Sequence, residues 1–454
     1  MKHLVIAAIA LWALFQVSAL LWTPRDPFPK ETFSRFIEAP PRVVADPYRN
    51  SYFYFFGLTA APSLDPGQAG YEVWVETTHN QLGASESQKP GQTELHRSTA
   101  TDSLVSEWDA EDPLAEFRKN TSALQAVIRD NRLLLNRYER LLGLPFEDWG
   151  FGSRALPRYR TVFAAHRLYA AEGFSLDTWR GLDRLRKEMQ CWRLILREAR
   201  TIHTKVFAQL VIADDLRLLS HVLAKPNLDK NMFAFGLQLS LPLTDSEYSL
   251  RWAIRNQLAL AAAGPHRVGS AGNEPASRHE SELEWLTQAA NLPPSAFDDL
   301  EHPSAPSSFG MAFPSAQGGA TYAAYYDAAI KASESRTGQF PRMTDIASTV
   351  QRGWVERLLN PRPIEPGWAR FYRQLMETDA RLRLASLQIQ LKRPSAQTTV
   401  PTRLAEIGSP YFDPFTGLPM LWSPTQQKLY SVGQDRLDDG GDPTFDISVS
   451  AVLK

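Results

Sequence analysis

The chain has 454 residues, of which 43% are hydrophobic, enough to bury a core and to form two or three packed units. Its 49 basic and 50 acidic side chains leave a net charge of −1, which argues against nucleic-acid binding and excludes a strongly acidic tail. A single cysteine, Cys191, excludes an intrachain disulfide, and its apolar neighbours indicate a buried structural thiol.

The first residues predict how the chain is targeted. An apolar run from Leu4 to Trp22 follows two polar residues, and its length just suffices to span about 30 Å of hydrocarbon as a helix. Val17–Ala19 also fits the small-residue rule for signal-peptide cleavage. Residues 1–23 are therefore either a signal anchor or a signal peptide. We favour the uncleaved anchor, because the apolar run continues beyond the cleavage motif and ends in a tryptophan suited to the membrane interface.

Both interpretations export the rest of the chain. An anchor predicts a protein of the bacterial inner membrane that crosses it once, with the bulk of the chain in the periplasm. Cleavage predicts a secreted or periplasmic protein instead. The flanking charges differ little, so the expected orientation rests on the signal-like layout of the segment.

Residues 24–112 predict an extended and loop-rich segment that contains an aromatic run. Its proline-rich beginning is typical of a spacer from the membrane. Every side chain from Tyr52 to Phe56 is aromatic, which favours a buried strand or another core-facing segment over a membrane-contacting patch. Residues 77–107 are rich in Ser, Thr, Gln and Gly and predict a loop or mobile insert.

Residues 113–263 predict a helical domain. Stretches in which apolar residues do not recur at helical spacing separate the predicted helices. Ser175 and Asp177 are candidate helix caps in one of these stretches. Successive helical hairpins are the expected architecture. Apolar residues recur three or four positions apart along Leu134–Leu142, Leu182–Ile195 and Phe207–Val222.

The remaining chain predicts three further units. Residues 264–320, rich in Gly, Pro, Ser and Asn, predict an irregular linker or loop region, and residues 321–395 return to a helical pattern. Residues 396–454 change to short apolar runs between proline and glycine turns. The predicted fold class is mainly α: a helical-hairpin bundle with a small α+β C-terminal module and an N-terminal membrane anchor.

Common catalytic signatures are absent from the sequence, including phosphate loops, dinucleotide fingerprints, zinc-protease helices and serine nucleophile elbows. His166 and His203 lie on helical stretches and are more typical of core or surface histidines than of catalytic bases. The pairs Asp214–Asp215 and Asp298–Asp299 consist of sequence neighbours, which point in different directions on a helix. We therefore expect neither pair to act as a cooperating carboxylate pair.

The C-terminal module begins with a predicted tight turn, Asp413–Gly417, in which aspartate, proline and glycine each suit a turn position. The apolar runs on either side of residues 423–425 predict two short strands that pair as a hairpin.

Four aspartates in the last loop, Asp435, Asp438, Asp439 and Asp442, form the candidate metal site. Carboxylates this dense repel one another, and calcium would relieve the repulsion. The spacing is not that of an EF-hand, and composition alone is more typical of a solvated acidic turn than of a calcium site.

Residues 410–447 resemble the C-terminal end of the major pseudopilins of type II secretion. The resemblance rests on a turn at Asp413–Pro419, on the Tyr-Ser-Val-Gly-Gln-Asp run that ends at Asp435, on the Gly-Gly turn before Asp442 and on Phe445–Ile447. In that family the last loop binds calcium. The resemblance implies Asp435 and Asp442 as side-chain ligands, joined by Asp438 or Asp439 and by carbonyl groups near residues 429–432.

The resemblance covers about a tenth of the chain. The apolar N-terminus has none of the acidic residues of a pilin, and Arg436 stands where the family has a glycine. The chain is therefore not expected to be a pilin subunit. As a whole it resembles uncharacterised membrane-anchored bacterial envelope proteins in its layout.

These observations favour a non-catalytic binding or scaffolding role in the envelope, with an envelope protein as partner and calcium stabilising the C-terminal module. The alternative to a binding or scaffolding role is an envelope hydrolase with a site in the helical region. In a third interpretation, the calcium loop is itself the contact for the partner. A pocket that gathers His166, His203 and Asp214 would distinguish the hydrolase, whereas a solid apolar bundle would favour scaffolding.

Overall fold

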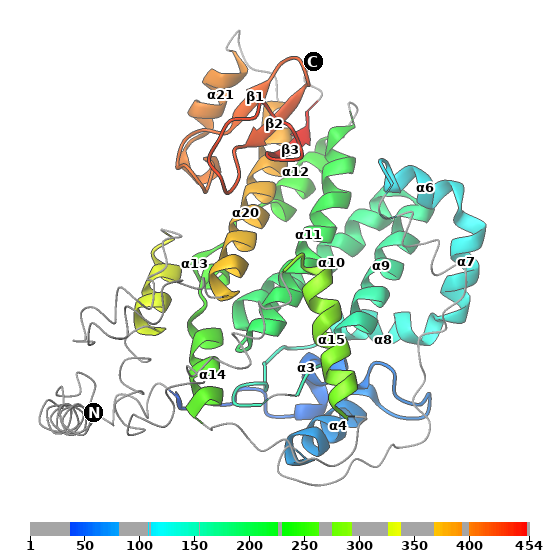
Figure 1. Ribbon diagram of the computed structural model, residues 1–454. Coiled ribbons are helices and arrows are strands. Elements are labelled where there is room, and N and C mark those ends of the chain that lie inside the picture. Colours follow the sequence, from blue (N-terminus) through cyan, green and yellow to red (C-terminus); the bar gives the residue numbers. More distant parts are fainter. Residues whose placement is uncertain are drawn as a thin grey trace, which may run out of the picture.

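The computed structural model describes Trp108 and residues 37–80, 110–153, 155–225, 229–262, 275–292, 326–336, 367–392 and 399–451. Within these ranges the chain forms fourteen α-helices and one small sheet, so the predicted mainly α class is confirmed (Figure 1). The predicted anchor, residues 1–23, lies outside the described residues. None of the described helices combines the length and the apolar character that a membrane crossing needs.

The N-terminal elements are a short 3-10 helix, η1 (Pro47–Arg49), and the helices α3 (Ser51–Gly57) and α4 (Pro66–Asn80). All seven side chains of α3 are buried, so the prediction of a core-facing segment is confirmed. The strand prediction is wrong. Asn50 caps the helix by accepting a hydrogen bond from the Tyr52 backbone N–H at 3.1 Å, and burial on all sides outweighs the β-preference of aromatic residues.

Glycines allow α3 and α4 to pack backbone against backbone. A Cβ atom placed on Gly57 would lie 1.9 Å from the Pro66 carbonyl oxygen, and one on Gly70 would lie 1.8 Å from the Phe53 carbonyl oxygen. No side chain fits at either position. The expectation that residues 24–112 are extended and loop-rich is therefore wrong for the two helices that these glycines hold together.

Six helices follow: α6 (Pro113–Lys119), α7 (Thr121–Asp130), α8 (Arg132–Leu142), α9 (Tyr159–Leu176), α10 (Thr178–Glu198) and α11 (Ile202–Ala224). The last three run alongside one another with very short connections, which confirms the predicted hairpins (Figure 1). Asp177 caps α10 by accepting from the Arg180 backbone N–H at 2.9 Å, as predicted, whereas Ser175 lies inside α9.

The next helices are α12 (Lys230–Leu239), α13 (Asp245–Tyr248), α14 (Arg251–Ala262), α15 (Pro275–Ala289) and α20 (Gly367–Leu391). Helix α15 packs against α9 and α11, so the prediction of irregular structure for residues 264–320 is wrong at that helix. Helix α20 packs along α11 and α12, and it confirms the helical pattern predicted within residues 321–395.

The C-terminal module contains α21 (Val400–Ile407), a 3-10 helix η2 (Ser409–Tyr411) and the strands β1 (Leu421–Ser423), β2 (Lys428–Ser431) and β3 (Ile447–Ser450). The strands form one antiparallel sheet in the order β1-β2-β3. The predicted hairpin is confirmed as β1 and β2, in which Trp422 pairs with Leu429. Strand β3, which the sequence analysis did not predict, packs against α20 and α11.

One continuous apolar core runs from Tyr52 in α3 to Ala451 after β3. The C-terminal module lies at one end of the molecule, and α3 and α4 lie at the opposite end (Figure 1). The division of the chain into separate domains stays a prediction.

Candidate functional site

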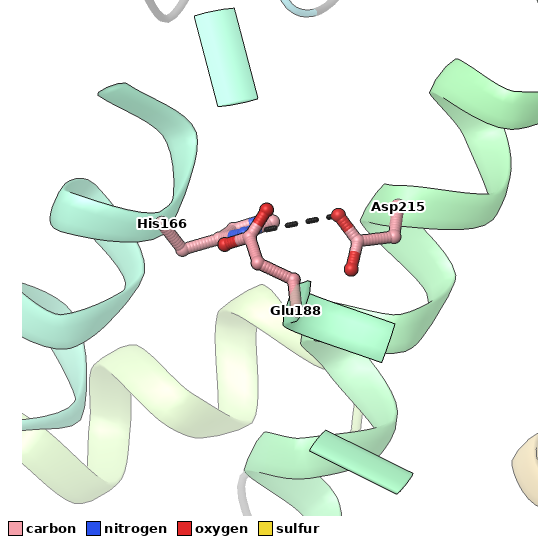
Figure 2. Close-up of side chains that lie close together, drawn as sticks. All are labelled: His166, Glu188 and Asp215. Atoms are coloured by element: carbon pink, nitrogen blue, oxygen red, sulfur yellow. Dashed lines mark hydrogen bonds and ion pairs between the residues drawn. The ribbon is translucent and has the colours of Figure 1, made fainter. Parts of the chain in front are cut away.

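His166, in the middle of α9, is the centre of a buried polar cluster. Its Nδ1 lies 2.8 Å from Glu188 Oε1 on α10 and 4.0 Å from Asp215 Oδ1 on α11. Its Nε2 lies 3.5 Å from Asp214 Oδ2, also on α11. Figure 2 shows the His166, Glu188 and Asp215 side chains pointing toward one another from separate helical segments. Three consecutive helices of the bundle thus supply the cluster.

The local sequence explains why these side chains face inward. Glu188 lies on the buried stripe of α10 between Leu185 and Trp192, at helical spacing from both. Asp215 lies on the buried face of α11, three residues after Ile212. Each carboxylate therefore occupies a position where the helix pattern calls for an apolar side chain.

A second set of side chains holds the cluster in place. The Tyr138 hydroxyl donates to Glu188 Oε1 at 2.6 Å and accepts from Trp192 Nε1 at 3.1 Å. Arg167 donates from Nε to Asp214 Oδ2 at 2.8 Å and from its terminal nitrogen to Oδ1 at 3.3 Å. One carboxylate oxygen of Glu188 and both oxygens of Asp214 are fixed by these contacts.

Other polar atoms of the cluster lack hydrogen bonds. Both oxygens of Asp215, Oε2 of Glu188 and Nε2 of His166 are buried and have no hydrogen-bond partner. A buried polar atom without a partner costs about 1–3 kcal/mol of desolvation free energy. Most such atoms in folded proteins are satisfied, so a concentration of four at one place is a feature of this cluster that calls for an explanation.

The charges at the cluster shift the pKa values of its members. Burial alone would lower the pKa of His166, but the Glu188 carboxylate and then Asp214 overcome it and raise the pKa to about 10. Burial, followed by repulsion from Glu188, raises the pKa of Asp215 well above its ordinary value. Burial also opposes ionisation of Asp214, but its contact with His166 and the charge of Arg167 hold its pKa below the ordinary value. Without a ligand, the cluster therefore favours an imidazolium and a protonated Asp215.

The same side chains could also hold a metal ion. Among the described residues, His166, Glu188 and Asp215 are the one group of three or more His, Cys, Asp or Glu side chains whose ligand atoms all lie within 4.8 Å of one another. One imidazole nitrogen and two carboxylates are a ligand set that proteins use for several divalent metals.

The structure brings together only part of the site predicted for a hydrolase. His166 and Asp214 meet, but His203 lies apart and lines a cavity of about 20 Å³ with residues such as Tyr159 and Asn256. Asp214 and Asp215 point in different directions, as expected, but both approach the same imidazole, one at each nitrogen. That they do not act as a cooperating carboxylate pair stays a prediction. His166 is a core histidine, as expected.

The four aspartates predicted as calcium ligands lie in the loop between β2 and β3. Asp435, Asp438 and Asp439 are exposed, and Asp442 is half-buried. Three of them bond locally: Asp435 accepts from the Leu437 backbone N–H at 3.1 Å, Asp438 from the Gly440 N–H at 2.9 Å and Asp442 from the Thr444 N–H at 2.9 Å.

The bond from Thr444 lowers the pKa of Asp442. No three of the four predicted ligands bring their carboxylate oxygens within 4.8 Å of one another. Calcium binding by this loop therefore stays a prediction.

The predicted turn at Asp413–Gly417 is confirmed. Asp413 Oδ1 accepts from the Phe415 backbone N–H at 2.8 Å, and the Asp413 carbonyl accepts from the Gly417 N–H at 2.8 Å. Its second carboxylate oxygen accepts from the Val432 N–H at 3.2 Å, directly after β2. One buried carboxylate thus ties the turn to the sheet.

Glu188 is the site residue that the sequence analysis missed. Its signal was a glutamate within the apolar stripe of a helix, and Asp215 carries the same signal. No protein-family model, curated protein or solved structure matches this chain. The resemblance to pseudopilins accordingly stays a prediction.

Proposed function

We propose that this chain is a non-catalytic binding or scaffolding protein of the bacterial envelope that presents its C-terminal module to an envelope protein partner. The observation that most supports this function is the arrangement in Figure 1, in which the module lies at the end opposite to α3 and α4. If residues 1–23 anchor the chain in the inner membrane, the helices nearest to them in sequence lie at one end and the module is displayed at the other.

The surface of the module supports a binding role. Three of the four most exposed large hydrophobic side chains among the described residues belong to its turns: Leu418 and Leu437 are each 64% exposed and Phe445 is 61% exposed. Exposing leucine and phenylalanine side chains to water costs free energy, and binding of a partner would bury them. Leu437 lies among the aspartates of the last loop, and Phe445 follows them.

The module is also held firmly on the helical bundle. Arg383 of α20 donates to the Phe412 carbonyl at 2.6 Å, and Gln388 of α20 donates to the Ser450 carbonyl at 2.6 Å. A partner that binds the module is therefore connected to the whole apolar core rather than to a loose appendage. That connection suits a scaffold.

Calcium is the second part of the proposal. The resemblance to pseudopilins implies that Asp435 and Asp442, with Asp438 or Asp439, bind one calcium ion in the last loop. Calcium binds carboxylate and backbone carbonyl oxygens in flexible loops. Bound there, the ion would order the segment that carries Leu437 and would stiffen the proposed partner surface.

Cross-linking in the native envelope tests the binding role. A photoreactive amino acid replaces Leu437 or Phe445 in the full-length chain, and Leu176, which is 48% exposed at the end of α9, serves as the matched control. We expect an adduct of one defined mass from both module positions and none from the control. Equal labelling at all three positions, or none from the module, would contradict the proposal.

Thermal unfolding tests the calcium site separately. The full-length chain is unfolded with calcium and with a chelator, beside Asp435→Ala and Asp442→Ala. Calcium at about a hundred times its dissociation constant should add roughly 2.7 kcal/mol of stability to the wild type. Both substitutions should abolish this gain. A wild type that does not respond to calcium would remove the ion from the proposal and leave the binding role to the cross-linking result.

A further inference from the structure

We propose that His166, Glu188 and Asp215 form a buried binding site for one divalent first-row transition-metal ion, separate from the calcium loop. Each of the three side chains comes from a different helix of the α9, α10 and α11 bundle, and their ligand atoms all lie within 4.8 Å of one another. In Figure 2 the Asp215 side chain points toward the His166 and Glu188 side chains. An ion there would link the three helices directly.

The state of Asp215 indicates that a ligand belongs in the cluster. Three described aspartates have no exposed surface: Asp148, Asp215 and Asp379. Asp148 accepts three backbone N–H groups at 2.7, 2.8 and 3.1 Å. Asp379 accepts one backbone N–H at 2.7 Å, a tyrosine hydroxyl at 3.0 Å and an arginine at 2.9 Å. No N–H or hydroxyl group donates to either oxygen of Asp215, whose nearest carboxyl neighbour is Glu188, so this fold supplies donors to its other fully buried aspartates but not to the one in the cluster.

The distances suit a transition metal after small movements. Bonds of about 2.0–2.1 Å in tetrahedral geometry place neighbouring ligand atoms about 3.3 Å apart. His166 Nδ1 is 2.8 Å from Glu188 Oε1 and 4.0 Å from Asp215 Oδ1, so one pair must separate and the other must approach by roughly half an ångström. The imidazole ligand favours zinc or iron over calcium and magnesium, which prefer sites built from oxygen alone.

The surrounding residues complete the arrangement. With Nδ1 on the metal, His166 presents Nε2 to Asp214 at 3.5 Å, and a carboxylate behind a metal-binding histidine is a common supporting contact. Tyr138 holds the Glu188 carboxylate in the same way.

Refolding in the presence of metal tests the site despite its burial. The full-length chain, without a histidine tag, is unfolded with a chelator and refolded with or without Zn²⁺, and the bound metal is counted by elemental analysis after gel filtration. We expect one zinc ion per chain and a higher melting temperature for the zinc-refolded protein. A folded wild type that retains no zinc would overturn the proposal and leave the cluster balanced by protons alone.

Matched variants locate the ion. Asp215→Asn and Glu188→Gln keep the side-chain shapes, and each should weaken zinc binding at least about tenfold. His221→Gln, on α11 but outside the cluster, and Asp442→Asn, in the C-terminal loop, should bind as the wild type does. Binding that is unchanged in both cluster variants, with cooperative unfolding preserved, would place the metal elsewhere and contradict the proposal.

A spectroscopic measurement remains decisive if the cluster variants do not fold. Wild-type protein refolded with Co²⁺ in place of zinc should show visible absorption bands of a low-coordinate cobalt ion, and X-ray absorption should show a single imidazole among oxygen ligands. A spectrum typical of hydrated cobalt, or one with two or more imidazoles, would overturn the assignment to His166, Glu188 and Asp215.

Discussion

The buried cluster around His166 and the acidic loop between β2 and β3 contain similar numbers of carboxylates in opposite environments. In the loop, water and nearby backbone N–H groups satisfy exposed aspartates such as Asp435 and Asp438. In the cluster, Glu188 and Asp215 lie away from water and keep oxygens without hydrogen bonds. The difference teaches that the density of carboxylates along a sequence says little about their need for a cation, whereas their desolvation says a great deal.

The largest effect should follow from breaking the cluster. We expect Glu188→Ala to lower the free energy of unfolding by about 3–5 kcal/mol, because it leaves His166 without its buried partner and Tyr138 without its acceptor. Denaturant unfolding in metal-free buffer measures the loss. Asp183→Ala, at a half-exposed position of the same helix, is the control and should change little. A loss below about 1 kcal/mol for Glu188→Ala would show that the buried pair is not a strong contact.

Asp413 is a buried carboxylate in the same module as the exposed loop. It therefore tests whether burial or position in the molecule decides how much a carboxylate contributes to stability. Asp413→Ala removes the acceptor of the Phe415 and Val432 backbone N–H groups, and we expect it to cost about 1–3 kcal/mol of stability. Thermal or urea unfolding gives the value, with the exposed Asp435→Ala as reference in the same module. If the two variants lose equal stability, burial does not distinguish the carboxylates as argued.

Lys205 extends the comparison to a positive charge on α11. Burial, opposed in part by Glu247, lowers its pKa to about 7, and its ammonium nitrogen donates to the Leu196 carbonyl at 2.6 Å. In the unfolded chain the pKa of this lysine is near 10.4. Between pH 7 and about pH 10 the unfolded state therefore binds more protons than the folded state, and the free energy of unfolding increases as the pH rises. Compared with Lys205→Met, the wild type should gain about 1–2 kcal/mol between pH 7 and pH 9.

Unfolding of both proteins across this pH range measures the difference between them. A wild type that loses stability relative to the variant as the pH rises would contradict the lowered pKa of Lys205.

The smallest effect is expected in the exposed loop. Without calcium, Asp435→Ala and Asp442→Ala should leave the melting temperature unchanged within experimental error, because surface changes away from buried contacts rarely matter. Calorimetry with a chelator present measures this directly. A clear loss of stability in either variant would show that the substituted aspartate contributes to the stability of the fold beyond its local hydrogen bonds.

Periodicity along the sequence predicts the helices of the bundle, and turn chemistry predicts the Asp413 turn and the first hairpin. Both depend on contacts between near neighbours. The aromatic run of α3 predicts a buried strand or another core-facing segment, and its helical state was not predicted, because side chains buried on every side carry no periodic signal. Strand β3 is only four residues long and pairs with β2 across a long loop, so local patterns do not reveal it.

The cluster itself could be predicted only in part. His166 and Asp214 were considered as site residues, but their meeting with Glu188 depends on how three helices are rotated against one another. Helical spacing shows which side of each helix is buried. It does not show which buried positions on different helices are level with one another, and that is set by packing across the bundle.

The attachment of the chain ahead of η1 has a mechanical consequence. Glu147 accepts hydrogen bonds from the backbone N–H of Val43 at 3.0 Å and of Val44 at 2.8 Å, and the Asn50 side chain donates to the Glu147 carbonyl at 2.8 Å. Arg200, in the connection between α10 and α11, forms an ion pair with the same carboxylate at 3.0 Å. Tension applied to the residues before Val43 would thus load several bonds at once and pass directly into the core. A pulling force on this segment would therefore be resisted by the core and not by the loops around it.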